Sequence, residues 1–125
     1  MTRPGAFDEL TAEIALARNG GRCERCNSRA TGELHHRRPR RMGGAGRRDA
    51  ATTSGAANCL CLCTSCHDRA ERRDRAAARH EGVILSAGRT PADEPVQAYM
   101  RGRWGWWLLD NDGGCTRVPA PEVSE

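Results

Sequence analysis

The stretches Cys23-Glu24-Arg25-Cys26 and Cys63-Thr64-Ser65-Cys66 form two CxxC pairs, separated by the 36 residues from Asn27 to Leu62. Two residues between thiols let both sulfurs reach one tetrahedral ion, and two such pairs complete the four ligands of a structural Zn²⁺. A redox-active CxxC is typical of a βαβ unit, and neither pair has one around it. The spacing therefore predicts a zinc site of Cys23, Cys26, Cys63 and Cys66, although spacing alone also allows Cys59 or Cys61 in place of Cys63.

The composition indicates that the fold needs a stabilising element such as a bound metal. The chain has 125 residues and a mass of 13.7 kDa, which is room for one compact domain, and only 38% of it is hydrophobic and 4% aromatic. A core that thin gives a small domain little stability through burial alone. Binding of a structural zinc contributes on the order of 10 kcal/mol to folding, which a core of this size cannot match.

The cysteine count and the start of the chain favour a protein of the cytoplasm. Seven Cys is an odd number, and Met1 to Glu9 lacks the basic flank and apolar run of a secretory signal. In a reducing compartment, clustered thiols are more often metal ligands than disulfides. The longest apolar stretch, from Trp104 to Leu109, is far shorter than the ~20 residues of a membrane span. We therefore expect a cytoplasmic protein without a membrane partner.

Basic residues are concentrated in one part of the chain. Between positions 18 and 48 there are ten Arg against two Glu, a local excess of 10 − 2 = +8. Such a stripe is typical of a protein that binds a polyanion, although a solvated basic face without a partner has the same composition. The ten residues are Arg18, Arg22, Arg25, Arg29, Arg37, Arg38, Arg40, Arg41, Arg47 and Arg48.

Local signals predict a small α+β fold. Asp8 is placed to cap a helix with Leu10, Ile14 and Ala17 on its apolar face, which Asn19-Gly20-Gly21 ends. A short extended segment follows over 33–38, then a loop over 42–55 and a strand or helical turn over 58–63. The run from Cys66 to about Glu81 predicts one helix, with Ser65 and Asp68 as a capping box and Gly82 as its end.

The last third of the chain predicts a β-hairpin. Trp104 to Leu109 and Cys115 to Val118 read as two strands joined by the turn Asp110-Asn111-Asp112-Gly113-Gly114. Residues 83–85 read as a short strand and 90–96 as a linker. We expect Trp104, Trp106 and Trp107 to pack on the thin core, with base stacking as the alternative. The predicted division is a core over 1–82, an extension with the hairpin over 83–118 and a disordered tail over 119–125.

Several polar groups suited to chemistry lie within or beside the loop that the thiols close. They are Glu33, His35, His36, Asn58, His67 and Glu71. Adjacent residues of a strand point to opposite sides, so one of His35 and His36 can face a metal while the other faces a substrate. His67 and Glu71 are four positions apart on the predicted helix and share a face, so they can bind one ion together.

Two segments of the sequence together resemble a known protein family. Glu-Leu-His-His-Arg-Arg-Pro-Arg-Arg-Met-Gly-Gly (33–44), followed by Asn-Cys-Leu-Cys-Leu-Cys-Thr-Ser-Cys-His (58–67), is similar to the HNH endonucleases of the variety clamped by two CxxC pairs. The match covers about residues 8–80. It implies a ββα-metal fold and hydrolysis of DNA phosphodiester bonds with a catalytic divalent ion. It also extends weakly to small HNH proteins of actinobacterial phages, which implies processing or packaging of phage DNA in the host cytoplasm, beside a terminase.

The resemblance also implies roles for individual residues. His36 is the general base, His35 and His67 are ligands of the catalytic ion, Asn58 holds the loop and the His36 ring, and Glu33 orients a neighbouring side chain. Glu71 stands where many members of the family have a further His. A carboxylate there is still a competent ligand and favours Mg²⁺ or Mn²⁺, but the third ligand stays open.

The arginines beside the histidine pair complete this hypothesis. Arg37, Arg38, Arg40 and Arg41 are expected to grip the phosphates on either side of the scissile bond, without base specificity. The rival hypothesis from another class is a zinc-stabilised nucleic-acid-binding module that cuts nothing. A nuclease acting on RNA shares the same site and differs only in substrate, and the sequence leaves the oligomeric state open.

Overall fold

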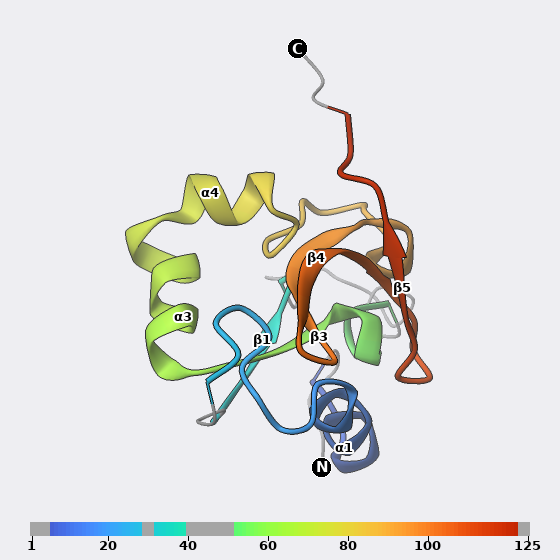
Figure 1. Cartoon of the computed structure of the whole chain (residues 1–125). Helices are drawn as coiled ribbons and strands as arrows, with labels where there is room; N and C mark the ends of the chain where they lie inside the picture. Colours follow the sequence, from blue (N-terminus) through green and yellow to red (C-terminus); the bar gives the residue numbers. More distant parts are fainter. Residues whose placement is uncertain (1–5, 29–31, 40–51, 123–125) are drawn as a thin grey trace.

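The computed structural model describes residues 6–28, 32–39 and 52–122, and these form a small α+β fold with two antiparallel sheets. The first sheet pairs β1 (Glu33–His36) with β2 (Cys59–Leu62), and the second has the order β3 (Val96–Met100), β4 (Arg103–Leu109) and β5 (Cys115–Val118). Helices α3 (Thr64–Asp68) and α4 (Arg75–His80) lie on one side of β1 and the second sheet lies on the other (Figure 1). None of the helices in the described part of the chain is both long and apolar enough to cross a bilayer.

Helix α1 (Glu9–Arg18) confirms the helix expected near the N-terminus. The Asp8 carboxylate accepts a hydrogen bond of 2.7 Å from the Thr11 amide, and Gly20 and Gly21 follow the helix with positive φ. The expected apolar face is wrong, because Leu10 is 65% exposed while Ala15 and Arg18 are buried. The helix turns its Arg18 side inward because that side chain is bonded to the main chain around β2.

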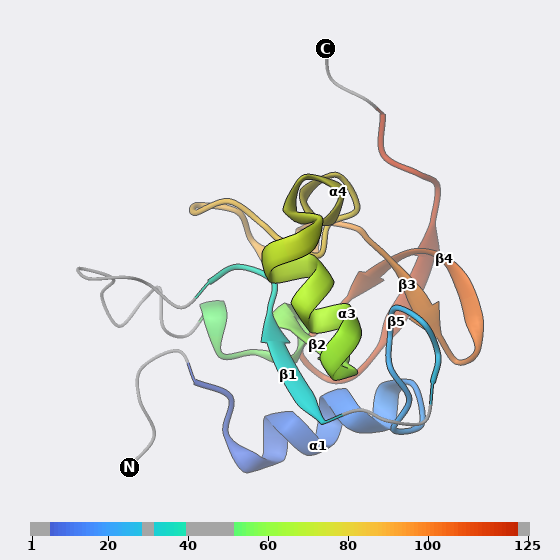
Figure 2. The same cartoon turned by 90° about the vertical axis from the view of Figure 1, so that its left-hand side faces the viewer.

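The β1–β2 hairpin separates two apolar clusters. In its register His35 lies opposite Leu60 and His36 lies opposite Cys59. Leu60 and Leu62 belong to the main core, whereas Cys59 and Cys61 belong to a smaller cluster with Ala15 of α1. Of the two alternatives expected over 58–63, the strand is confirmed, because β2 covers Cys59–Leu62. The 3₁₀ turn (Ala56–Asn58) leads into it and shares only Asn58 with this stretch. Figure 2 shows α1 running beneath β1 while α3 stands alongside it.

The prediction of one continuous helix over 66–81, capped by Ser65 and Asp68, is wrong. The helical region begins at α3 (Thr64–Asp68) with Cys63 as N-cap, continues as a π-helical segment (Arg69–Arg73) and resumes as α4 (Arg75–His80). Asp74 interrupts it with φ −146° and ψ 57°, and caps α4 through a hydrogen bond from the Ala77 amide. Gly82, at φ +76°, ends the helical region as expected.

The C-terminal part of the chain shares the main core with the part before it. Leu60 and Leu62 cluster with buried side chains from beyond residue 82. These include Val83, Val96, Met100, Trp107 and Leu109. The hairpin of β4 and β5 confirms the prediction, whereas β3 was not expected and Val83–Leu85 forms no strand, although all three of its residues are buried. The last residues of the expected tail, 123–125, lie outside the described residues.

Candidate metal centres

The two CxxC pairs meet as predicted. One sulfur each of Cys23, Cys26, Cys63 and Cys66 lies within 4.8 Å of all the others, and the Sγ atoms of Cys26 and Cys63 are 3.8 Å apart. Four sulfurs at about 2.3 Å from a tetrahedral Zn²⁺ lie about 3.8 Å from one another. The Arg25 and Cys66 amides each lie 3.4 Å from a sulfur, of Cys23 and Cys63 respectively. The cluster could therefore hold a structural metal such as zinc.

The acid–base properties of the thiols fit such an ion. Burial raises the pKa of Cys23, and burial together with the neighbouring thiol of Cys63 raises that of Cys66. Burial also opposes ionisation of Cys26, but hydrogen bonds with Ser28 and the nearby thiols outweigh it and lower its pKa to about 7. Thiols packed this closely repel one another once ionised. A dication among them stabilises all four as thiolates.

The strand register decides which cysteines join the cluster. Cys59 and Cys61 are buried on the side of β2 that faces α1, with Ala15 and Phe7, and take no part in the four-sulfur group. Spacing alone left these two thiols as alternatives to Cys63. The structure brings Cys63 to the cluster because it follows the end of β2 and caps α3 with its sulfur.

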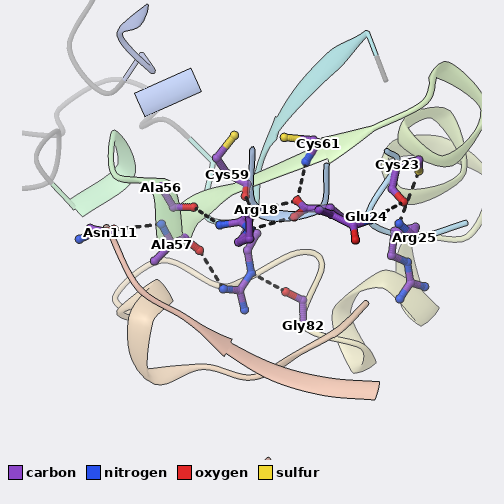
Figure 3. Close-up of polar contacts among 12 residues, drawn as sticks. Arg18, Cys23, Glu24, Arg25, Ala56, Ala57, Cys59, Cys61, Gly82 and Asn111 are labelled. Carbon is purple, nitrogen blue, oxygen red and sulfur yellow. Dashed lines mark hydrogen bonds and ion pairs between the residues drawn. The ribbon is translucent and has the colours of Figure 1, made fainter. Parts of the chain in front are cut away.

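A buried ion pair that the sequence did not predict anchors the first CxxC pair, Cys23–Cys26, to the β1–β2 hairpin (Figure 3). Both carboxylate oxygens of Glu24 accept hydrogen bonds of 2.8 Å from the Arg18 guanidinium, and both side chains are 0% exposed. Glu24 also accepts from the Cys61 amide at 2.9 Å, and Arg18 donates to the carbonyls of Ala56 and Cys59. The Arg18–Glu24 ion pair therefore links α1, the first CxxC pair and β2.

A second group of possible ligands lies where the hairpin meets α3. One donor atom each of His35, His67 and Glu71 lies within 4.8 Å of the other two. The distances to Glu71 Oε1 are 3.2 Å from His35 Nδ1 and 3.7 Å from His67 Nε2. Neighbouring ligands of an octahedral ion with bonds of about 2.1 Å lie about 3 Å apart. The structure thus places the two expected ligands together with Glu71, the candidate that the sequence left open.

His35 is held in a state suited to coordination. Its Nε2 lies 2.8 Å from the Val83 carbonyl oxygen, which can only accept a hydrogen bond, so Nε2 must be the nitrogen that carries the hydrogen. Nδ1 then carries the lone pair, and it is buried and hydrogen-bonded to none of the described residues. Burial lowers the pKa of His35 to about 4, against the opposing effects of the Val83 bond and the Glu71 charge. A neutral ring with a free lone pair is what a metal ligand requires.

Glu33 orients His67 from the first strand. Its Oε1 lies 2.5 Å from His67 Nδ1, and its other oxygen accepts a hydrogen bond of 2.8 Å from the Thr64 hydroxyl. These two bonds lower the pKa of the Glu33 carboxyl. Because Nδ1 is occupied by a carboxylate, Nε2 is the atom that His67 presents toward His35 and Glu71. Glu33, His67 and Glu71 also line an open cleft of about 660 Å³, together with Thr64, Ser65, Asp68 and Arg72.

His36 lies on the other side of β1. Its ring stacks on Phe7 with centroids 3.8 Å apart and an interplanar angle of 12°. Phe7 and Leu34 belong to the cluster between the hairpin and α1, whereas His35 faces Val83 and Glu71. The two adjacent histidines therefore separate as strand geometry predicts, and His35 is the one that faces the possible ion.

Asn58 closes the loop between the strands, as expected. Its Oδ1 accepts from the Arg38 amide at 2.7 Å, and its Nδ2 donates to the carbonyls of Arg38 and Thr53. The side chain is fully buried. The contact is with the main chain that follows β1, so Asn58 holds the backbone two residues beyond His36. Its expected effect on the His36 ring stays a prediction.

Two of the arginines expected to grip phosphates are internal. Arg37 is 0% exposed, and all its hydrogen-bond acceptors among the described residues are carbonyl oxygens; Arg38 is 8% exposed. The acceptors of Arg37 are Ala57, Gly82, Pro91, Glu94 and Pro95. The expectation is wrong for these two side chains, because they hold the end of β1 to the C-terminal part of the chain. Arg40 and Arg41 lie outside the described residues.

Comparisons with protein-family models, with curated proteins and with solved structures find no match to this chain. The function of the chain is therefore inferred from its two side-chain clusters and from the elements that hold them.

Proposed function

We propose that this protein is a divalent-metal-dependent nuclease of the HNH type, with β1, β2 and α3 as its ββα-metal motif. The observation that carries the proposal is the convergence of His35, His67 and Glu71 at the junction of hairpin and helix. The cysteine cluster supports it, because Cys63 and Cys66 belong to the same helical turn as His67 and would fix that turn once a zinc is bound. Asn58 and Glu33 support it by holding the backbone and the His67 ring.

Hydrolysis of a phosphodiester requires an activated water, neutralisation of the phosphate charge and help for the departing 3′ oxygen. A divalent ion supplies Lewis acidity at the phosphate and the leaving oxygen when it is bound. His35 and His67 present lone pairs in tautomers set by Val83 and Glu33, and Glu71 contributes a negative charge. A site with a carboxylate suits Mg²⁺ or Mn²⁺, which we propose as the physiological ion.

His36 is the proposed general base. A neutral imidazole, with an ordinary pKa of about 6.5, accepts a proton at physiological pH. His36 follows a proposed metal ligand directly in the chain, and stacking on Phe7 fixes the plane of its ring. In this role it takes a proton from the attacking water at one of its ring nitrogens.

A plasmid assay tests the proposal. The zinc-loaded protein is incubated with supercoiled DNA and Mg²⁺ or Mn²⁺, and His36→Ala is expected to cut about 10²-fold more slowly or worse. His35→Ala is expected to lose cleavage together with the divalent site. His80→Ala is the matched control, because His80 is exposed on α4 and should cut as the original chain does. Equal rates for the original chain and His36→Ala would remove His36 from the mechanism, and cleavage of RNA alone would change the substrate.

One observation favours the alternative of a zinc-stabilised binding module that does not cut. His36 stacks on Phe7 on the side of β1 opposite His35. Metal analysis after dialysis should find one tightly bound zinc under either proposal. Titration with Mn²⁺ should find a second, weaker site that His67→Ala abolishes if the protein is a nuclease. A chain with no second site would support binding alone.

A further inference from the structure

A second cavity lies on the face of the helical region opposite the proposed catalytic site. Its volume is about 370 Å³, within the range of ligand pockets. The two CxxC pairs contribute Cys26 and Cys66 to its wall, and β4 contributes Trp104. The π-helical segment contributes Arg69, and the two caps of α4 contribute Asp74 and Glu81. Of these side chains, only the two thiols belong to one of the two candidate metal clusters.

The wall of this cavity carries a flat platform that is already ordered. The Arg25 guanidinium lies over the Trp104 ring, 5.3 Å from its centroid. It is held there by hydrogen bonds to Glu81 and to the carbonyl of Gln97. Trp104 packs on Tyr99, with centroids 5.0 Å apart, yet remains 39% exposed. Nucleobases stack on aromatic rings and on arginine planes of this kind, and a platform that is fixed in advance loses little entropy on binding.

The same cavity offers one cation without a partner. Arg69 is exposed, and its side chain makes no ion pair or hydrogen bond with any described residue. Its neighbours Arg72, Arg73 and Arg75, in contrast, are paired with Asp68 or Glu71. A free guanidinium beside a stacking platform matches a nucleotide, which combines a phosphate with a planar base. The carboxylates of Asp74 and Glu81 offer acceptors for an N–H group of a base, such as N3–H of thymine.

The cavity and the proposed catalytic cleft lie on opposite faces of one helical segment. Cys66, Arg69 and Ala70 line the cavity, while His67, Asp68 and Glu71 line the cleft. A helix with its side chains is about 10 Å across, so a strand that reaches both faces needs only a few nucleotides between them. We propose that the cavity of Trp104, Arg25 and Arg69 binds a base and phosphate of a single-stranded nucleic-acid segment. The link to cleavage rests on the proposed function, with the bound segment a few nucleotides from the phosphate that is cut.

Binding of a labelled oligothymidylate to the zinc-loaded full chain tests this inference, measured by fluorescence anisotropy without Mg²⁺ or Mn²⁺. Trp104→Ala is expected to weaken binding about tenfold, while Trp104→Phe keeps a stacking face and most of the affinity. Arg69→Gln is expected to lower the slope of log K against log salt by about 0.7. Arg79→Gln removes the same charge from α4 outside the cavity, and should leave the affinity within about twofold.

Circular dichroism first shows whether each variant is folded. If Trp104→Ala does not fold, the comparison of Trp104→Phe with the original chain still tests the stacking role. Unchanged binding by a folded Trp104→Ala would overturn the inference, as would an equal loss in Arg69→Gln and Arg79→Gln. Stronger binding of polyglutamate than of oligothymidylate would also overturn it, since the cavity would then suit an acidic peptide. The outcome is independent of cleavage: a protein that binds through Trp104 but cuts nothing refutes the nuclease and keeps the site.

Discussion

A substitution in the buried Arg18–Glu24 ion pair tests whether this pair holds the first CxxC pair in place. Glu24→Gln keeps the shape of the side chain and removes its charge, so no cavity is created. The amide has one oxygen for the three donors that now contact the carboxylate, and its NH₂ group faces the Arg18 guanidinium. Removing one partner of a buried pair costs about 3–5 kcal/mol, because the other charge stays buried without compensation. That is a large part of the total stability of a domain of this size.

Urea unfolding of the zinc-loaded protein, followed by circular dichroism, measures this cost. For a slope of about 2 kcal/mol per molar urea, the midpoint should fall by about 2 M. Glu13→Gln, on the exposed side of α1, is the matched control and should stay within about 0.5 kcal/mol. Arg18→Met combined with Glu24→Gln should recover part of the loss, since it removes both charges. A loss below about 1 kcal/mol in Glu24→Gln, or no recovery in the double variant, would refute the reasoning.

Three further predictions concern the metal, the pH dependence and the loop. A strong zinc chelator is expected to unfold the chain at neutral pH, with recovery on adding Zn²⁺, because about 10 kcal/mol of folding free energy is lost with the metal; near-native circular dichroism of the metal-free chain would contradict this. The pKa of His35 is about 4 when folded against about 6.5 when unfolded, so its contribution to stability is complete above pH 6.5 and is lost as the pH falls toward 4. Between pH 7.0 and 5.5, and without a second divalent ion, the original chain should lose about 1 kcal/mol more than His35→Gln, and parallel pH curves would speak against a buried neutral ring. Asn58→Ala leaves three buried backbone groups without their partner, so it should lower the free energy of unfolding by about 3 kcal/mol and speed hydrogen exchange of the Arg38 amide. Unchanged exchange of that amide would show that Asn58 does not hold this loop.

Features that depend on a few neighbouring residues were predictable. The two CxxC pairs, the Asp8 cap and Asn19-Gly20-Gly21 at the two ends of α1, and the turn between β4 and β5 are all set within a handful of positions. The grouping of His67 with Glu71 follows from helical spacing, and the opposite directions of His35 and His36 follow from strand geometry.

Features that depend on distant partners were not predictable. Arg18 and Arg37 look like members of a basic surface stripe, but both are buried. Carbonyls far away in the chain bind the Arg37 guanidinium, and the Glu24 carboxylate together with the carbonyls of Ala56 and Cys59 binds that of Arg18. Asp74 breaks a stretch that reads as one helix. The choice of Cys63 over Cys59 and Cys61 depended on which side of β2 faces α1.

By itself the sequence determined the chemical groups and their local geometry: four thiols in two knuckles, two adjacent histidines and a helical His67–Glu71 pair. Only the tertiary structure decided which histidine faces the possible ion, that Glu71 joins it, and which arginines remain at the surface. The physical reason is that ligand sets and buried charges are completed by groups far apart in the chain, so their partners appear only when the hairpin, the helix and the C-terminal sheet pack together.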